Sequence, residues 1–171
     1  FFLLAILVVV FSWLRPSFAS AGNVTDILRS ASISAVMFLG LTWIIAAGEI
    51  DVSFMSVAAL STMIIAGLVS AGFGWPVAVL AALSAGVAVG LLNGLLVAGM
   101  GLPALVITIA TGGLAGSVAA AIGKGTSIPM ATTGFVGPIV DADLGIVPVI
   151  AIVVAALYAV AWVLQDRTTF G

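Results

Sequence analysis

Two carboxylates stand close together in a sequence that has very few charged residues. Glu49 and Asp51 lie in IIAAGEIDVSFMSVAALS (residues 44–61), between two long apolar runs. Acids at this spacing could bind a cation or carry a proton, which is the chemistry of ion-coupled transport. They could instead mark a turn between two helices, because Asp51 or Ser53 is a good N-cap for a helix that begins near Phe54. We favour the turn, because the sequence offers no histidine, no intramembrane lysine and no further acid to relay a proton.

The composition places the chain in a lipid bilayer. Of its 171 residues, 64% are hydrophobic and 6% are charged, whereas soluble domains carry about 25% charged residues. Apolar runs close to the roughly 20 residues that cross a bilayer recur along the chain. The net charge of −2 gives no sign of a nucleic-acid partner. With neither cysteine nor histidine, we expect no metal site, no cofactor and no catalytic residue.

Prolines and polar stretches divide the chain into six apolar segments. We therefore predict an all-α fold, a polytopic transmembrane helical bundle in one membrane domain. The expected spans are residues 1–14, 30–47, 54–71, 76–98, 102–122 and 147–164. Pro76, Pro103 and Pro148 stand where the first turn of a helix begins, because a missing N–H costs least there. Residues 16–29 and 123–146 are the expected longer loops, the second with room for a short surface helix.

Small and polar residues within the spans are further candidates. Glycines at four-residue intervals line one helix face and let neighbouring helices approach closely. These glycines are Gly86, Gly90, Gly94, Gly112 and Gly116. We predict that they serve helix packing, with sliding of these faces in a conformational cycle as the alternative. Serine and threonine can bond to carbonyls of their own helix, whereas Asn93 needs an interhelical partner or a wet cavity.

Four stretches resemble the permeases of monosaccharide-type ABC importers, the ribose and autoinducer-2 permease group. FASAGNVTDILRSASISAVMFLGLTWII resembles their Phe-x-Ser-x-x-Asn loop and second span, and AGEIDVSFMSVAALS their Gly-x-Ile-Asp-(Leu/Val)-Ser stretch. GLLNGLLVAGMGLPALVITIATGGLAG and GIVPVIAIVVAALYAVAWVLQDRTTFG resemble two later segments in the same order. Together they extend over nearly the whole chain. The signature turn comprises Gly48, Glu49, Ile50, Asp51 and Ser53. Glu49 stands where that signature has a second glycine, and Ala115 where the fifth span often has arginine.

The resemblance implies the N-terminal part of a sugar-importer permease in the bacterial inner membrane. It implies a second permease subunit, identical or different, cytoplasmic ATPase subunits and a periplasmic sugar-binding protein. The chain itself would be a transport subunit and not an enzyme. The last residues would form the cytoplasmic edge before the segment that meets the ATPase: Arg167, Thr168, Phe170 and Gly171. Loop 123–146 would then be periplasmic. The positive-inside rule gives the opposite orientation from only four basic residues, so we follow the resemblance.

A sugar pathway needs hydroxyl and amide groups with little charge. The candidates are Thr42, Asn93, Thr108 and Thr111. The alternative function is an ion- or proton-coupled secondary transporter that uses Glu49 and Asp51. A membrane scaffold without transport is a third possibility, and an intramembrane enzyme is the least favoured because no nucleophile–base pair is present. The sequence does not identify the solute.

Overall fold

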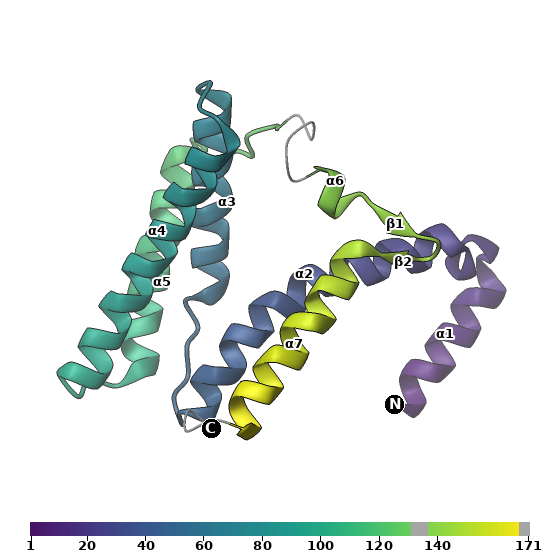
Figure 1. Ribbon diagram of the computed structural model, residues 1–171, viewed down its shortest axis with the longest axis horizontal. Helices are drawn as coiled ribbons and strands as arrows, with labels where there is room; N and C mark the ends of the chain where they lie inside the picture. The colour runs from purple at the N-terminus through teal and green to yellow at the C-terminus, as the bar shows by residue number, and fades with distance from the viewer. Residues whose placement is uncertain (131–136, 168–171) are drawn as a thin grey trace. The chain divides into compact units, whose positions relative to one another are not determined.

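The computed structural model describes residues 1–130 and 137–167, which are almost entirely helical (Figure 1). The long helices are α1 (Phe2–Leu14), α2 (Ala21–Ala46), α3 (Phe54–Ser70), α4 (Trp75–Gly94), α5 (Ala104–Ile122) and α7 (Val149–Arg167). The shorter elements are a 3₁₀ turn (Pro16–Ala19), a π-helical turn (Leu95–Gly99), α6 (Gly137–Val140) and the antiparallel strands β1 (Asp143–Leu144) and β2 (Val147–Pro148). Within these described ranges, four helices are long and apolar enough to cross a bilayer: α2, α4 with its π-helical turn, α5 and α7. The predicted all-α membrane fold is confirmed.

The six predicted apolar segments coincide with the six long helices, but the second helix starts earlier than expected. The prediction placed a loop over residues 16–29, whereas α2 already begins at Ala21. The hydroxyl of Ser20 accepts a hydrogen bond from the backbone N–H of Asn23 at 3.3 Å, which is the pattern of an N-cap. The loop prediction was therefore wrong for residues 21–29, whose polar side chains have partners within the fold.

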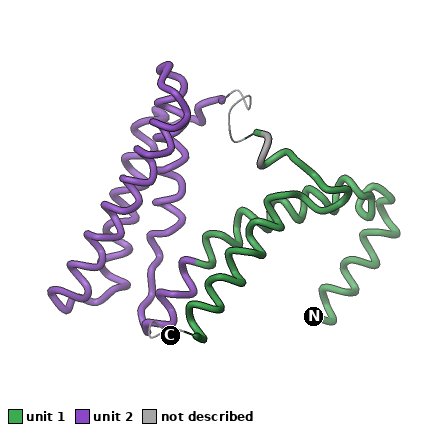
Figure 2. Tube along the Cα trace, viewed as in Figure 1, with its two compact units in different colours: residues 1–39, 135–171 green, residues 40–134 purple. Residues whose placement is uncertain are grey.

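The chain divides into two compact units, and the boundary falls inside α2 (Figure 2). The first unit comprises residues 1–39 and 135–171, and the second comprises residues 40–134. In the first unit α2 and α7 lie side by side, and the hydroxyl of Tyr158 donates to the carbonyl of Ala35 at 2.9 Å (Figure 1). The hydroxyl of Thr25 on α2 donates to the carbonyl of Ile146 at 2.9 Å.

Arg29 ties the start of α2 to the segment that precedes α7. Its Nε donates to the carbonyl of Val140 at 2.9 Å. Its Nη2 lies 2.9 Å and 3.1 Å from the two carboxylate oxygens of Asp143, and its Nη1 lies 3.1 Å from Asp26. These charge-assisted contacts hold the Arg29 side chain against the fold, so the helix can include a residue that the sequence analysis placed in a loop.

The long connection predicted at residues 123–146 contains the expected short helix, α6. It also contains strand β1, which pairs with β2 and was not predicted. Pro148 is fully buried and belongs to β2, and α7 begins one residue after it, at Val149. Two-residue strands carry no periodic signal in the sequence, which explains why the hairpin was missed.

The second unit is a packed set of three helices in which α3 lies against both α4 and α5 (Figure 1). Its hydrophobic core is formed by Leu60 of α3 with Ala115 and Ala119 of α5. Partly buried side chains surround this core: Val57, Met63, Ile64 and Ile122. Small residues at the contact let the helix backbones approach closely, which is the usual packing of helices in membranes.

Enlarging a core alanine of α5 is predicted to destabilise the protein. Ala119→Leu should lower the free energy of unfolding by about 1–3 kcal/mol, because the added atoms must displace Leu60 and its neighbours. The matched control is Ala120→Leu at the exposed neighbouring position, which should change it by less than about 0.5 kcal/mol. Thermal unfolding of the protein in detergent measures both. Equal effects of the two substitutions would contradict the packing described here.

Candidate functional site

The two acids lie on a segment without helix that joins α2 to α3. Gly48 ends α2 with a left-handed φ of +81°. The N–H groups of Gly48 and Glu49 bond to the carbonyls of Ile45 and Ile44 at 2.9 Å and 3.1 Å, which is a Schellman ending. Residues 49–53 then run without helix or strand until α3 begins. The two acids thus lie between two helices, where the sequence placed a turn. The sequence did not predict that this segment finds hydrogen-bond partners on α4 and α5.

Thr108 of α5 supplies the partner for the backbone of this segment. Its hydroxyl accepts the N–H of Val52 at 3.2 Å. The same hydroxyl lies 3.4 Å from the carbonyl oxygens of Ile50 and Leu105, either of which can accept its proton. Thr108 is only 2% exposed, so one hydroxyl satisfies backbone groups that water would otherwise have to reach.

A chain of hydrogen bonds connects Asp51 to α4. One carboxylate oxygen of Asp51 accepts the backbone N–H and the hydroxyl of Ser53, each at 2.6 Å. The Ser53 hydroxyl in turn accepts from the side-chain NH₂ of Asn93 at 3.2 Å. Ser53 occupies the predicted N-cap position of α3, but it makes no side-chain capping bond; its hydroxyl donates to Asp51 and accepts from Asn93 instead. The Asp51 side chain therefore fixes the turn into α3.

Gly112 allows this segment to lie directly on α5. A Cβ atom at Gly112 would come within 3.1 Å of the Cα atom of Ser53, which is backbone and cannot swing away. One turn further along, a Cβ atom at Gly116 would lie 3.8 Å from the Ser56 hydroxyl, an ordinary contact. Thr108 and Gly112 thus hold successive parts of the segment against the first turns of α5.

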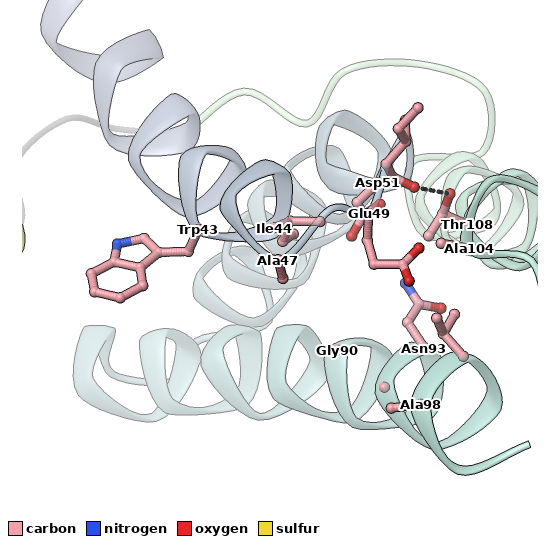
Figure 3. A pocket seen from close by; sticks show the side chains of 13 residues that line it. Trp43, Ile44, Ala47, Glu49, Asp51, Gly90, Asn93, Ala98, Ala104 and Thr108 are labelled. Atoms are coloured by element: carbon pink, nitrogen blue, oxygen red, sulfur yellow. Dashed lines mark hydrogen bonds between the residues drawn. The ribbon is translucent and has the colours of Figure 1, made fainter. Parts of the chain in front are cut away.

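A pocket of about 380 Å³ opens beside the segment, within the second unit (Figure 3). Its lining residues are Trp43, Ile44, Ala47, Glu49, Ile50, Asp51, Gly90, Asn93, Gly94, Val97, Ala98, Ala104 and Thr108. In Figure 3 the side chains of Glu49 and Asn93 point toward one another. Asn93 is 8% exposed, and its carbonyl oxygen Oδ1 is the one buried side-chain polar atom without a partner among the described residues.

The structure brings together some of the predicted pathway residues and separates others. Asn93 and Thr108 line the pocket together with three residues of the signature turn, Glu49, Ile50 and Asp51. Thr42 and Thr111 are not among the lining residues. Thr42 lies on α2, and the Thr111 hydroxyl bonds within α5 to the carbonyl of Ile107 at 3.0 Å.

The glycines selected for packing have different surroundings. Gly90 and Gly94 line the pocket, and a Cβ atom at either would meet nothing within 4 Å. A Cβ atom at Gly86 would lie 3.9 Å from Val57. Arg167 is the last residue of α7, in the first unit. Thr168, Phe170 and Gly171 lie outside the described residues.

Several lining residues were not predicted from the sequence. Val97 and Ala98 belong to the π-helical turn that continues α4, and such turns are frequent at functional sites. Trp43 of α2 also lines the pocket. It lies in a long apolar run, so nothing in the sequence distinguishes it from a residue that only packs. Gly99, the last residue of this turn, and Gly101 just after it indicate an irregular helix end, but nothing in the sequence indicates a π-helical turn.

The charged groups of the pocket are both negative. Glu49 and Asp51 are acidic, and no basic residue is among the described lining residues. In the described ranges no group of three or more His, Cys, Asp or Glu side chains could hold a metal ion. The pocket therefore offers hydrogen-bond acceptors on an otherwise largely apolar wall.

Comparisons with known proteins identify related permeases. The family model for the permease component of branched-chain amino acid transport systems matches residues 23–171. The ribose import permease protein RbsC of Escherichia coli (strain K12) is 37% identical over 87 residues, which are 51% of this chain and 27% of that protein. RbsC of Bacillus subtilis (strain 168) is 38% identical over 69 residues, 40% of this chain and 21% of that protein.

The D-allose transport system permease protein AlsC of Escherichia coli (strain K12) is 37% identical over 91 residues, 53% of this chain and 27% of that protein. Each of these matches covers less than a third of the relative's length. No solved structure matches the chain.

Two neighbouring glycines of α5 test the contact between the segment and the helix. Gly112→Ala is predicted to lower the free energy of unfolding by about 1–3 kcal/mol, because its Cβ atom meets the Ser53 backbone. Gly113→Ala is the control, since a Cβ atom there meets nothing within 4 Å. It should leave stability unchanged or raise it by up to about 1 kcal/mol through helix propensity. The melting temperatures of the two variants in detergent measure this difference. A Gly112→Ala variant as stable as Gly113→Ala would contradict the close contact between Gly112 and Ser53.

Proposed function

Because the chain belongs to the permease family of branched-chain amino acid transport systems, we propose that it forms part of the membrane pathway of an ATP-driven monosaccharide importer. The protein is a polytopic permease of the bacterial cytoplasmic membrane. The sugar class is supported by the names of the relatives, which are permeases for ribose and D-allose. Four long apolar helices provide the membrane-spanning part that such a role requires.

The proposed partners follow from the mechanism of such importers. A second permease subunit would complete the pathway, and cytoplasmic ATPase subunits would supply the energy. A periplasmic sugar-binding protein would deliver the solute, and loop 123–146 would face it. In this scheme the chain performs no chemistry: ATP binding and hydrolysis on the partner shift the permease between states with different affinity for the solute.

The pocket beside residues 49–53 is the proposed point at which the solute contacts this chain. Its size falls in the range of about 300–1,000 Å³ that small-molecule sites occupy. Its wall combines apolar surface with polar groups from Glu49, Asp51, Asn93 and Thr108. A largely apolar wall with a few placed polar groups is the usual composition of a site for a small organic solute. This pocket, in a chain of the permease family, is the observation that carries the proposal.

Uptake into liposomes tests the proposal against ion-coupled transport. The full-length permease, reconstituted with its ATPase and binding protein, is predicted to take up D-ribose or D-allose with ATP and without any ion gradient. Asp51→Asn should keep more uptake than Asp51→Leu, because an asparagine oxygen can still accept the N–H of Ser53. Uptake that follows a proton or sodium gradient without ATP, and that both substitutions abolish equally, would establish the ion-coupled alternative instead.

A further inference from the structure

A hollow of about 560 Å³ lies where the end of α1 turns into the start of α2, within the first unit (Figure 1). It shares no described lining residue with the pocket beside residues 49–53. We propose that this hollow binds a lipid headgroup that joins a phosphate to a primary ammonium, as in phosphatidylethanolamine. The hollow is lined by Phe11 of α1, by Arg15, Ser17 and Phe18 of the turn, and by Asn23 and Asp26 of α2.

The hollow lies at the level of the lipid headgroups. The apolar helix α1 has no buried residue, so lipid covers it in a bilayer. Trp13, which is 84% exposed, and Arg15 stand at its end, and such side chains mark the membrane interface. The 26 residues of α2 extend over about 39 Å, whereas the hydrocarbon core is about 30 Å thick. The polar first turns of α2 therefore reach into the headgroup region.

Opposite charges line the hollow without pairing with one another. Arg15 is exposed, and its guanidinium makes no ion pair or hydrogen bond with any described residue. The side chain of Asp26 is 73% exposed and lies 3.1 Å from Arg29, which also binds Asp143 at 2.9 Å. One basic side chain thus serves two acids, so this cluster keeps an excess negative charge. A ligand with a negative and a positive group can satisfy both ends of the hollow.

The turn between the two helices holds these groups in place. The rings of Phe11 and Phe18 pack with their centroids 5.7 Å apart. The backbone N–H of Phe18 donates to the carbonyl of Arg15 at 2.8 Å. The side-chain NH₂ of Asn23 donates to the carbonyl of Phe18 at 2.7 Å, which leaves its Oδ1 atom as an acceptor without a partner among the described residues. The site is therefore formed before the ligand arrives.

The headgroup of phosphatidylethanolamine supplies the groups that the hollow lacks. Its phosphate can accept two parallel N–H bonds from the guanidinium of Arg15 and one bond from the Ser17 hydroxyl. Its ammonium has three N–H donors, like that of lysine, for the carboxylate of Asp26 and Oδ1 of Asn23. Its acyl chains can continue past Phe11 along the exposed apolar side chains of α1.

Related ligands fit the hollow less well. Phosphatidylglycerol has a phosphate but no ammonium, so it brings a negative charge toward Asp26 without a cation. Phosphatidylcholine carries a quaternary ammonium, which has no N–H to donate to Asp26 or Asn23. Soluble phosphoethanolamine has both charged groups but lacks acyl chains that could bury apolar surface against α1. Phosphatidylethanolamine alone of the four matches every group.

Native mass spectrometry of the protein released from detergent micelles counts single bound lipids and tests the inference. The probes are the palmitoyl-oleoyl forms of phosphatidylethanolamine, phosphatidylcholine and phosphatidylglycerol. The wild type should bind the first about tenfold more tightly than the other two. Arg15→Gln should weaken all three about tenfold, because each has a phosphate. Asp26→Asn should weaken phosphatidylethanolamine alone, whereas Asp26→Glu keeps the charge and should retain most of the preference.

An adjacent acid and base at the end of α7 provide matched controls. Asp166→Asn and Arg167→Gln remove exposed charges that do not line the hollow, so they should leave the preference unchanged. Soluble phosphoethanolamine should compete with the lipid only at about hundredfold higher concentration or more. Melting temperatures without added lipid check that Asp26→Asn is folded, which is expected because Arg29 keeps its bond to Asp143.

Three outcomes would overturn the inference. Equal affinity of the wild type for the three lipids, or equal losses in Arg15→Gln and Arg167→Gln, would indicate only a general attraction between basic residues and the membrane surface. Undiminished binding of phosphatidylethanolamine to Asp26→Asn would remove the ammonium from the site. Competition by phosphoethanolamine at the concentration of the lipid would make a soluble molecule, and not a lipid, the occupant. None of these outcomes bears on ATP-driven uptake, which tests the proposed function separately.

Discussion

The structure of the second unit depends on satisfying the backbone of five residues that form no helix. Backbone that is buried and forms neither helix nor strand needs hydrogen bonds from other parts of the protein or from water. Residues 49–53 meet this condition through the Thr108 hydroxyl, which binds at Val52, and through the Asp51 side chain, which holds the turn into α3. The pocket lies where this segment, α4 and α5 come together, so the same groups that satisfy the backbone also form the polar part of the site.

Close packing is the second requirement, because an extended segment can bond to α5 only if it touches the helix. Gly112 permits this contact by lacking a Cβ atom, and the core of Leu60, Ala115 and Ala119 continues the contact along α3. On α4 the requirement is different: Gly90 and Gly94 have no neighbour within reach of a Cβ atom and border the pocket instead. Glycine therefore permits a close backbone contact on α5, whereas on α4 it leaves space for the pocket.

The sequence predicted the helices well because long apolar runs have few other stable forms in lipid. It also singled out Asn93, since a lone amide in an apolar span needs a partner. It placed the break between α2 and α3 correctly, but it predicted neither the partners of residues 49–53 nor the early start of α2, because both depend on residues far away in the chain. Thr108 lies more than fifty residues beyond the segment, and Arg29 finds its acceptors more than a hundred residues away. The sequence could not tell which of the two threonines, Thr108 or Thr111, bonds to residues 49–53, because only the fold decides which hydroxyl faces that segment.

Hydrogen–deuterium exchange of the full-length permease in nanodiscs tests the central claim most directly. The amide of Val52 should exchange slowly in the wild type, because its N–H is bonded to Thr108. Thr108→Val keeps the shape of the side chain but removes the acceptor, and it should accelerate exchange across residues 50–53 by about tenfold or more. Thr62→Val, at an exposed hydroxyl that bonds only within α3, should leave this exchange unchanged. Equal and rapid exchange in the wild type and in Thr108→Val would contradict the account.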